Sequence, residues 1–153
     1  MKKILVTGGA GYIGSFMVRR LHDEGYQTVI VDNLSQGHQE AIKDFKLEKI
    51  DLVTEKEKLA KLLAVEKFDA VVHMASFIQM GESYENPAKY YRNNVIGFLN
   101  LLEGAVAAET KKIILSSSAG VYGNPVKLPI EEDDPKNPLN PYGKTKYIME
   151  RML

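Results

Sequence analysis

The sequence predicts an α/β protein with a doubly wound parallel sheet. Five short segments, most of them apolar, each lead into a polar or glycine-containing turn, and segments with helical periodicity separate them. Continuous apolar runs, rather than an alternation of apolar and polar residues, are typical of strands that are covered on both faces. Ligands of such sheets bind beyond the carboxyl ends of the strands. The residues that follow each predicted strand are therefore the first candidates for a functional site.

A glycine-rich turn follows the first predicted strand, residues 4–6. Gly8, Gly11 and Gly14 have the spacing G-x-x-G-x-x-G, a variant of the dinucleotide-binding fingerprint. One glycine permits the turn, one lets a pyrophosphate approach the backbone, and one lets the next helix pack closely on the strand. The free amides at the start of that helix would hold the phosphates. An ordinary strand-to-helix turn remains the alternative for this motif alone.

The second predicted strand, residues 28–31, is followed by Asp32, which lies 18 residues beyond Gly14. Dinucleotide-binding folds place an acidic residue near this point, where it bonds the adenosine ribose hydroxyls. Its charge repels a 2′-phosphate, so the position favours NAD over NADP. A turn-forming role for Asp32 is the alternative. The turn-rich loop over residues 33–38 is expected to lie beside the ribose.

Three further strands complete the predicted sheet, over residues 46–52, 68–74 and 112–115. Each of them ends in, or leads into, polar residues. Asp51 is a candidate acceptor for the adenine amine, and the last strand runs into three serines that end at Ser118. His73 is expected to be a core or turn residue rather than a catalyst. Since the carboxyl ends of parallel strands share one edge, these residues are expected to converge there.

Helical periodicity and end signals define the helices between the strands. The first helix is expected to begin near Tyr12 and to end at Gly25, because glycine is a natural C-terminal stop. Thr54, with a glutamate three residues later, is expected to cap the second helix as a capping box. Pro87 suits the start of a long third helix. The last helix is expected near Tyr142, after loops over residues 75–83 and 120–141.

Residues at helical spacing mark the first three helices, and those of the second helix are expected to supply its buried face while those of the third give it an apolar face. In chain order these residues are Ile13, Phe16, Met17, Arg20 and Leu21, then Leu59, Leu62, Leu63 and Val65, then Tyr91, Val95, Phe98, Leu99, Leu102 and Val106.

The composition is that of one ordinary globular domain. The chain has 153 residues, of which 44% are hydrophobic and 26% are charged, and its 20 basic and 20 acidic residues cancel. No cluster of basic residues suggests a nucleic-acid or membrane partner, and no segment is long enough to span a membrane. The absence of cysteine excludes disulfides and thiolate metal sites. We therefore expect a soluble, cytoplasmic protein without a metal centre.

Tyr142 and Lys146 are the main catalytic candidates. They are four residues apart, so a helix places them side by side on one face. A free phenol has a pKa near 10, and lowering it by about three units requires about 4 kcal/mol of preference for the phenolate. An ammonium at about 4 Å supplies about 1 kcal/mol in water and about 4 kcal/mol at an effective dielectric constant near 20. A partly buried lysine therefore suffices to make the tyrosine a base.

Ser118 is a candidate third member of this group. Its hydroxyl could hydrogen-bond the substrate hydroxyl from which Tyr142 removes a proton, while a hydride moves between the substrate and a nicotinamide. A tyrosine and a lysine four residues apart also occur by chance, and a triple serine is a common polar strand end. The order of these residues after a dinucleotide loop and an acidic strand end favours catalysis.

Six motifs together resemble one family. TGGAGYIGS, DNLSQG, HMAS, PAKYYRNNV, SSSAGVYG and PYGKTK are similar to the extended short-chain dehydrogenase/reductases, in particular to the UDP-hexose 4-epimerases, over residues 2–151. The resemblance implies a Rossmann-type NAD-binding domain over residues 1–153 and a tightly held NAD. It also implies epimerisation at C4 of UDP-glucose or UDP-galactose through a transient 4-keto sugar. By this resemblance Tyr142 is the base, Lys146 contacts the nicotinamide ribose, and Ser118 orients the hydroxyl.

The same resemblance identifies the residues expected to contact the cofactor. They are Gly8, Gly11, Tyr12, Ile13, Gly14, Asp32, Asn33, Leu34, Ser35, Gln36, Gly37, Asp51, Leu52, Met74, Ala75, Ser76, Phe77, Ile78, Asn93, Ser116, Tyr142 and Lys146.

Family members are about twice as long as this sequence, and their C-terminal half supplies most of the UDP-sugar pocket. We therefore expect a cofactor-binding part that retains NAD but does not turn over a nucleotide sugar. The family also implies a homodimer through the helices at 87–108 and 142–153. A nucleotide-sugar 4,6-dehydratase is an alternative, although the run Ser118-Ala119-Gly120 lacks the acidic residues that elimination of water needs. The second alternative is a non-catalytic NAD-binding module.

Overall fold

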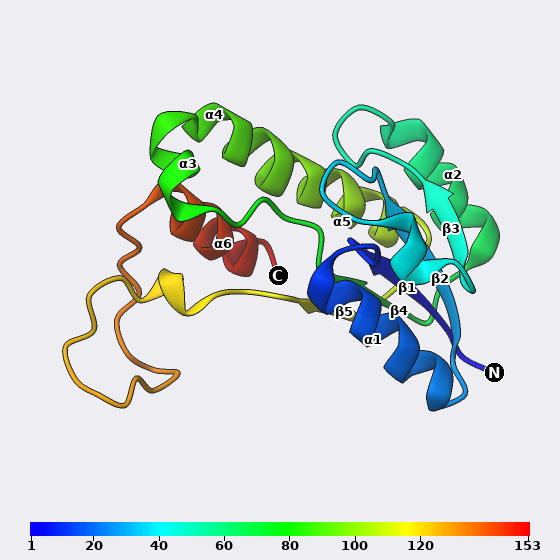
Figure 1. Cartoon of the computed structure of the whole chain (residues 1–153), viewed down its shortest axis with the longest axis horizontal. Helices are drawn as coiled ribbons and strands as arrows, with labels where there is room; N and C mark the ends of the chain where they lie inside the picture. The colour runs from blue at the N-terminus through cyan, green and yellow to red at the C-terminus, as the bar shows by residue number, and fades with distance from the viewer. The chain divides into compact units, whose positions relative to one another are not determined.

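The structure, a computed structural model, describes all residues from 1 to 153. The chain forms two compact units, and Figure 1 labels their helices and strands. Unit 1 comprises residues 1–76 and 99–116, and unit 2 comprises residues 77–98 and 117–153.

Unit 1 contains a five-stranded parallel sheet with the order β3-β2-β1-β4-β5. In the register of the central strands, Leu5 lies opposite Val29 on one side and Val71 on the other. This order confirms the predicted doubly wound sheet, because the chain leaves the central strand first in one direction and then in the other. The strands are β1 (Lys3–Thr7), β2 (Gln27–Asp32), β3 (Lys46–Lys49), β4 (Ala70–His73) and β5 (Ile113–Leu115).

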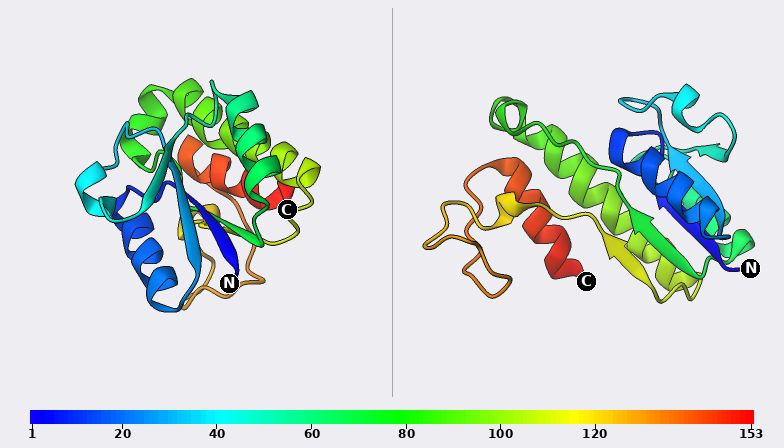
Figure 2. Two further views of the ribbon diagram at one scale, coloured as in Figure 1. Left: turned by 90° about the vertical axis from the view of Figure 1, so that its right-hand side faces the viewer. Right: turned by 60° about the horizontal axis from the view of Figure 1, so that its bottom comes forward.

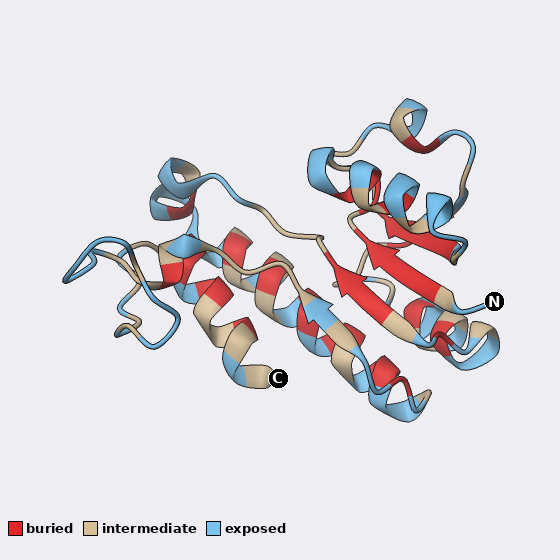
Figure 3. Cartoon of the chain, turned by 90° about the horizontal axis from the view of Figure 1, so that it is seen from below, coloured by how far each residue is buried: buried red, intermediate tan, exposed pale blue.

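Helices cover the two faces of this sheet unequally. Helix α1 (Tyr12–Asp23) lies on one face, and α2 (Lys56–Glu66) lies on the other, beside the later residues of α5 (Gly97–Ala107) (Figure 2). A short 3-10 helix, η1 (Gln39–Ile42), precedes β3. Right-handed crossovers explain the arrangement, because β1 to β2 and β4 to β5 run in opposite directions across the sheet. In Figure 3 the strands β1, β2 and β4 are mostly buried, whereas β5 is not.

Helix α1 begins and ends as predicted. Gly25 has φ +80°, and its N–H donates to the carbonyl of His22 at 2.9 Å, which ends the helix. Ile13 and Phe16 are 61% and 58% exposed, whereas Gly14, Ser15 and Val18 are buried. Gly14 lies against the turn that follows β1, where a β-carbon would lie 2.1 Å from the Gly8 carbonyl oxygen.

The start of α2 corrects a second prediction. The helix begins at Lys56, and Thr54 does not cap it. No side chain caps the helix, and Asp51 instead stabilises the turn before it, where its carboxylate accepts the N–H groups of Val53 and Thr54 at 2.9 and 3.0 Å. Glu55 in turn accepts the N–H of Asp51 at 2.8 Å. Of the four residues expected on the buried face of α2, Leu59 and Leu63 are buried, Leu62 is half-buried, and Val65 is 70% exposed.

Unit 2 is helical. Helix α3 (Met80–Glu85) falls partly within the segment 75–83 that was expected to be a loop. The next helix, α4 (Pro87–Tyr90), starts at the predicted proline, and Asn86 caps it by accepting the N–H of Lys89 at 3.2 Å. A π-helical turn, η2 (Tyr91–Ile96), continues α4 into α5. After the 3-10 turn η3 (Ala119–Val121), helix α6 (Pro141–Met152) begins where the last helix was predicted.

The buried face of the long helix is also different from the prediction. Phe98 is fully buried as expected, but Leu99 and Val106 are 38% and 76% exposed. The buried positions are shifted and include the polar Asn94 and the small Ala105 beside Tyr90 and Leu101. The π-helical turn has the wider i to i+5 hydrogen bonding, so a single α-helical period does not run through it. No helix in the chain is long and apolar enough to cross a membrane.

Glu66 links three elements at the end of the sheet away from the polar loops. Its carboxylate lies 2.6 Å from the Lys3 ammonium on β1 and 2.9 Å from the Lys46 ammonium on β3. Hydrogen bonds from these two lysines lower the pKa of Glu66 from 4.5 to about 2. Because the pKa is lower in the folded state, the stabilisation is present above pH 4.5 and is lost as the pH falls toward 2.

We predict that Glu66→Gln makes the stability of the chain less sensitive to acid between pH 4.5 and 2, and lowers the stability at pH 7. Urea unfolding at a series of pH values measures both effects. Glu40→Gln, which changes an exposed carboxylate on η1, is the matched control and should leave the pH profile unchanged. An unchanged profile in Glu66→Gln would contradict the prediction.

Candidate functional site

The glycine turn between β1 and α1 has the tight geometry that its motif predicts. Gly8 has φ +72°, and its N–H donates to the carbonyl of Val31 at 2.8 Å. A β-carbon on Gly8 would lie 2.5 Å from the backbone nitrogen of Ala75, and one on Gly14 would lie 2.1 Å from the carbonyl oxygen of Gly8. Neither position tolerates a side chain, because the obstacles are backbone atoms. A β-carbon on Gly11 would meet only the Gly8 oxygen, at 3.3 Å.

The start of α1 has no side-chain cap. Gly11 is the N-cap residue, and no side chain accepts a hydrogen bond from the first turn. The first N–H groups of a helix have no partner within the helix, and they carry partial positive charge. This end of α1 is therefore suited to an anion.

Asp32 holds the glycine turn against the end of β2. One carboxylate oxygen accepts the N–H of Ala10 at 3.0 Å, and the other accepts the N–H of Leu34 at 2.8 Å. The side chain is almost completely buried. Asp32 thus forms a turn, as its alternative interpretation proposed, and it also fixes the loop that carries the glycines.

Asp51 lies at the end of the neighbouring strand β3 and bonds the same loop region. It accepts a hydrogen bond from the side chain of Asn33 at 2.7 Å. Partial burial opposes ionisation, but the hydrogen bonds from Asn33, Thr54 and Val53 outweigh it and hold the pKa of Asp51 below its usual value. Asp51 is therefore a charged acceptor. His73, in contrast, is a core residue of β4, buried and 2.6 Å from the Thr7 hydroxyl.

The residues predicted to contact a cofactor fall in both units. Unit 2 contains Phe77, Ile78, Asn93, Tyr142 and Lys146. Unit 1 contains the rest, namely Gly8, Gly11, Tyr12, Ile13, Gly14, Asp32, Asn33, Leu34, Ser35, Gln36, Gly37, Asp51, Leu52, Met74, Ala75, Ser76 and Ser116. Within unit 1 they lie at or beyond the carboxyl ends of β1 to β5.

The three candidate catalytic residues all belong to unit 2, where η3 packs against the first turn of α6. The Ser118 hydroxyl oxygen accepts the N–H of Gly120 at 3.1 Å, which leaves its proton for another acceptor. A β-carbon on Gly143 would lie 2.7 Å from the carbonyl oxygen of Gly120. The two backbones therefore meet without a side chain between them. This contact fixes Ser118 near the turn of α6 that carries Tyr142.

Tyr142 and Lys146 lie one turn apart on α6, and both are buried. Tyr142 is 7% exposed and Lys146 is 2% exposed. Burial lowers the pKa of Lys146 from 10.5 to about 8. The ammonium is still the main form at pH 7, since the pKa remains above that value. A positive charge that is shielded from water acts on a neighbouring phenol more strongly than an exposed charge does.

Asn94 is a positioning residue that the sequence did not identify. Its side chain accepts the N–H of Phe77 at 2.9 Å and donates to the carbonyl of Phe77 at 3.0 Å. It also donates to the Thr145 hydroxyl at 3.0 Å, and that hydroxyl donates to the carbonyl of Tyr142 at 2.7 Å. The buried amide thus joins the segment at Phe77 to the helix of Tyr142. The neighbouring Asn93, which the motif did indicate, donates to Asn94 at 3.0 Å.

Comparison with known proteins identifies the family. Residues 4–153 match the model of the NAD dependent epimerase/dehydratase family. The chain therefore belongs to this family, as the motifs predicted.

Among the similar proteins are several UDP-glucose 4-epimerases. The one from Rhizobium meliloti is 47% identical over 98% of this chain, and the one from Lactobacillus helveticus is 45% identical over 99% of it. A crystal structure of UDP-glucose 4-epimerase from Brucella ovis in complex with NAD is 44% identical, with a TM-score of 0.97 over 100% of this chain and 47% of its own. The Bifidobacterium longum enzyme in complex with NAD+ and UDP is 35% identical, with a TM-score of 0.95 over 99% of this chain and 48% of its own.

This chain spans about half the length of the curated relatives that it matches, namely 45% of the R. meliloti protein and 46% of the L. helveticus protein.

The glycine turn yields a prediction on stability. Gly14→Ala is expected to destabilise the chain by about 1–3 kcal/mol, the usual cost of overpacking, because the new carbon meets backbone atoms. Gly11→Ala should cost much less, since its one neighbour lies at 3.3 Å. Gly81→Ala on α3, where nothing lies within 4 Å, is the control. Thermal unfolding should rank the three variants in this order, and equal effects at Gly14 and Gly81 would contradict it.

The amide of Asn94 yields a second prediction. Asn94→Ala leaves the Phe77 backbone groups and the Thr145 hydroxyl without this partner, so it should speed hydrogen exchange at the Phe77 amide and lower stability by about 1–3 kcal/mol. Asn100→Ala is the matched control, because its buried amide donates to the carbonyl of Leu52 at 2.8 Å in unit 1. Unchanged exchange at Phe77 in Asn94→Ala, or equal acceleration in both variants, would overturn the role assigned to Asn94.

Proposed function

We propose that unit 1 binds NAD at the glycine turn. The observation that carries this proposal is the uncapped start of α1 beside Gly8 and Gly11, together with the charged Asp32 at the end of β2. The pyrophosphate would accept the free N–H groups of the first turn of α1. The adenosine ribose would lie near Asp32, whose charge disfavours a 2′-phosphate. The B. ovis and B. longum structures, which their descriptions report as NAD complexes, support this assignment.

The proposed reaction is epimerisation at C4 of a UDP-hexose, interconverting UDP-glucose and UDP-galactose. The relatives are UDP-glucose 4-epimerases, and the N-terminal half of each matches this chain. When bound, NAD would accept the hydride from C4 of the sugar and return it to the opposite face. The residues that the motifs predicted as cofactor contacts in unit 1 and in unit 2 are proposed to contact NAD. We propose this chain as the cofactor-binding part of the enzyme.

Tyr142, Lys146 and Ser118 are proposed to move the proton. The Tyr142 phenolate would accept the proton of the C4 hydroxyl as the C4 hydride departs, and would return that proton in the reverse step. The buried charge of Lys146 would favour the phenolate, and Ser118 would donate its free proton to the sugar oxygen. Burial of both side chains on α6 supports these roles. The motif Tyr142-Gly143-Lys144-Thr145-Lys146 supports them independently.

The dehydratase alternative has less support. Elimination of water from a sugar needs an acid beside the catalytic hydroxyl, and Ser118 is followed by Ala119 and Gly120. The relatives named above carry epimerase names.

The proposed assembly is a homodimer through the helices at 87–108 and 142–153. Leu99 and Val106 support it, because they present exposed apolar side chains along α5.

The test of cofactor binding is the NAD content of the purified chain, measured by mass spectrometry after denaturation, with titration of the apo form by NAD and NADP. We expect near-stoichiometric NAD and weak binding of NADP. Asp32→Asn should reduce the ratio of the affinity for NAD to the affinity for NADP, because it removes the charge that repels the 2′-phosphate of NADP. Glu40→Asn serves as the control for an acidic residue outside the turn. Absence of bound NAD together with no measurable affinity would refute the proposal.

The test of catalysis is conversion of UDP-galactose to UDP-glucose. We expect the 153-residue chain to bind NAD without measurable turnover, because the relatives are about twice as long. Conversion of UDP-galactose by the 153-residue chain alone would show that this expectation is wrong.

A further inference from the structure

Three side chains of unit 2 meet at the junction between α3 and α4. Glu82, in the first turn of α3, accepts hydrogen bonds on both of its carboxylate oxygens. The Lys89 ammonium donates to one oxygen, and the Tyr90 hydroxyl donates to the other at 2.8 Å. Hydrogen bonds from Lys89 and Tyr90 hold the pKa of Glu82 below its usual value. The carboxylate is therefore charged at neutral pH, and it fixes two consecutive residues of α4.

The same lysine and tyrosine contact the ring of Phe77. The Lys89 nitrogen lies 4.6 Å from the centre of this ring, and the centre of the Tyr90 ring lies 5.9 Å from it, at an interplanar angle of 57°. Both separations are in the range of favourable cation–π and aromatic contacts. Asn94 holds the backbone of the same residue, through its bonds to the N–H and the carbonyl of Phe77. Phe77 is thus held at its ring and at its backbone by the helical segment that α4 and η2 form.

Tyr90 remains a hydrogen-bond donor at neutral pH. Its side chain is fully buried, and burial together with the hydrogen bond to Glu82 and the charge of Glu82 raises the pKa of the Tyr90 hydroxyl to about 12. A buried hydroxyl that keeps its proton needs an acceptor, and leaving it without one is costly. Glu82 supplies this acceptor, so a rotation of Tyr90 away from Phe77 would break a bond that the buried hydroxyl requires.

The pair of Lys89 and Glu82 affects geometry more than stability. The two side chains are 35% and 31% exposed, and ion pairs that keep contact with water usually contribute little to stability. The lysine side chain is long and flexible. Without the carboxylate its ammonium would extend into water rather than stay over the Phe77 ring.

We propose that Glu82 is a positioning residue for the nicotinamide half of NAD. By holding Lys89 and Tyr90, its carboxylate keeps the Phe77 ring in one orientation where this half of the cofactor binds. The inference rests on the proposed function, in which Phe77 contacts NAD and Lys146 of the same unit contacts the nicotinamide ribose. The adenosine and the pyrophosphate are assigned to the glycine turn and β2 of unit 1, so Glu82 should not affect their binding.

Titration calorimetry of the 153-residue chain with NAD and with ADP tests this role. ADP lacks the nicotinamide half, so it reports only on the part of the cofactor that is assigned to unit 1. Glu82→Gln removes the charge that holds Lys89, and it should weaken NAD binding about tenfold and leave ADP binding unchanged. Glu103→Gln is the matched control, because Glu103 pairs with Lys56 at 2.5 Å between α2 and α5 of unit 1, and it should leave both affinities unchanged.

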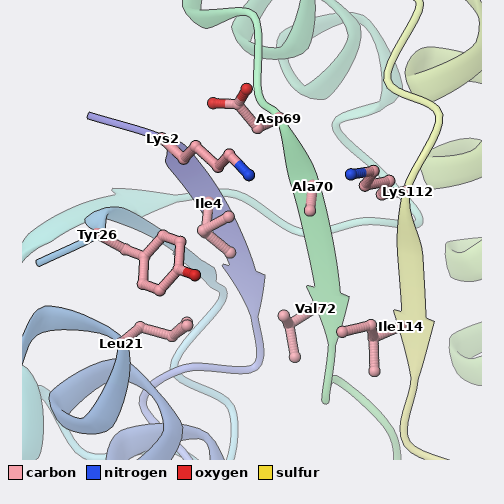
Figure 4. A pocket seen from close by; sticks show the side chains of 9 residues that line it. All are labelled: Lys2, Ile4, Leu21, Tyr26, Asp69, Ala70, Val72, Lys112 and Ile114. Carbon is pink, nitrogen blue, oxygen red and sulfur yellow. The ribbon is translucent and has the colours of Figure 1, made fainter. Parts of the chain in front are cut away.

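A second variant removes the cation instead of the carboxylate. Lys89→Met keeps most of the side-chain stem, loses the ammonium over the Phe77 ring, and should weaken NAD binding several-fold without an effect on ADP. Lys112→Met is its control, because Lys112 lies beside Ala70 and Ile114 of the sheet, with β1 and β4 between it and the ring of Tyr26 (Figure 4).

A double-mutant cycle separates positioning from a general loss of stability. In Phe77→Leu the ring is absent, so adding Glu82→Gln should cause no further loss of NAD affinity. Chemical shifts give a check that needs no ligand. The ring current of Phe77 should move the signals of the Lys89 side-chain protons upfield in the wild-type chain, and this displacement should disappear in Glu82→Gln.

Four results would overturn the inference. They are an equal NAD affinity of the wild-type chain and Glu82→Gln, a parallel loss of ADP affinity in Glu82→Gln, additive effects of the two substitutions in the cycle, and Lys89 signals that Glu82→Gln leaves in place. A wild-type chain that binds neither NAD nor ADP would refute the proposed function itself, and the inference with it.

Discussion

The close approach of α1 to β1 is the constraint on which the rest of unit 1 depends. Gly14 lies against the Gly8 carbonyl, and Gly8 in its left-handed conformation lies against the backbone at Ala75. The nearest neighbours of both positions are backbone atoms, which cannot move aside as a flexible side chain can, so the turn requires glycine at Gly8 and at Gly14. The carboxylate of Asp32 at the end of β2 also stabilises this turn, because it accepts the N–H of Ala10. The first turn of α1 has no side-chain cap, because its N-cap residue is Gly11, which has no side chain.

The sequence predicted those parts of the fold that local chemistry determines. Apolar runs identified the strands, Gly25 marked the end of α1, and Pro87 and Tyr142 marked the starts of two helices. All of these signals act within a few residues. The spacing from Gly14 to Asp32 was also informative, because one helix and one strand, each of predictable length, fill the chain between them.

Helix faces were less predictable, because they depend on packing rather than on hydrophobicity. Ile13 and Phe16 have helical spacing and are apolar, yet they are exposed, whereas Gly14 and Ser15 are buried and Gly14 lies against the backbone of Gly8. In the long helix the π-helical turn moves the buried stripe to positions that include Asn94. A buried asparagine has no apolar signal, so its bonds to Phe77 and Thr145 became visible only when the backbone was placed.

Partial desolvation of Lys146 is the property that suits unit 2 to the proposed proton transfer. A fully hydrated ammonium would be screened, and would add only about 1 kcal/mol to the preference for a phenolate at about 4 Å. Stronger desolvation would push the lysine pKa below 7, and the charge itself would be lost. Burial that lowers the pKa of Lys146 to about 8 lies between these limits, so the charge persists at neutral pH in surroundings of low dielectric constant. The close contact of Gly120 with Gly143 and the hydrogen bond from Asn94 to Thr145 hold α6 in the position in which Lys146 is buried.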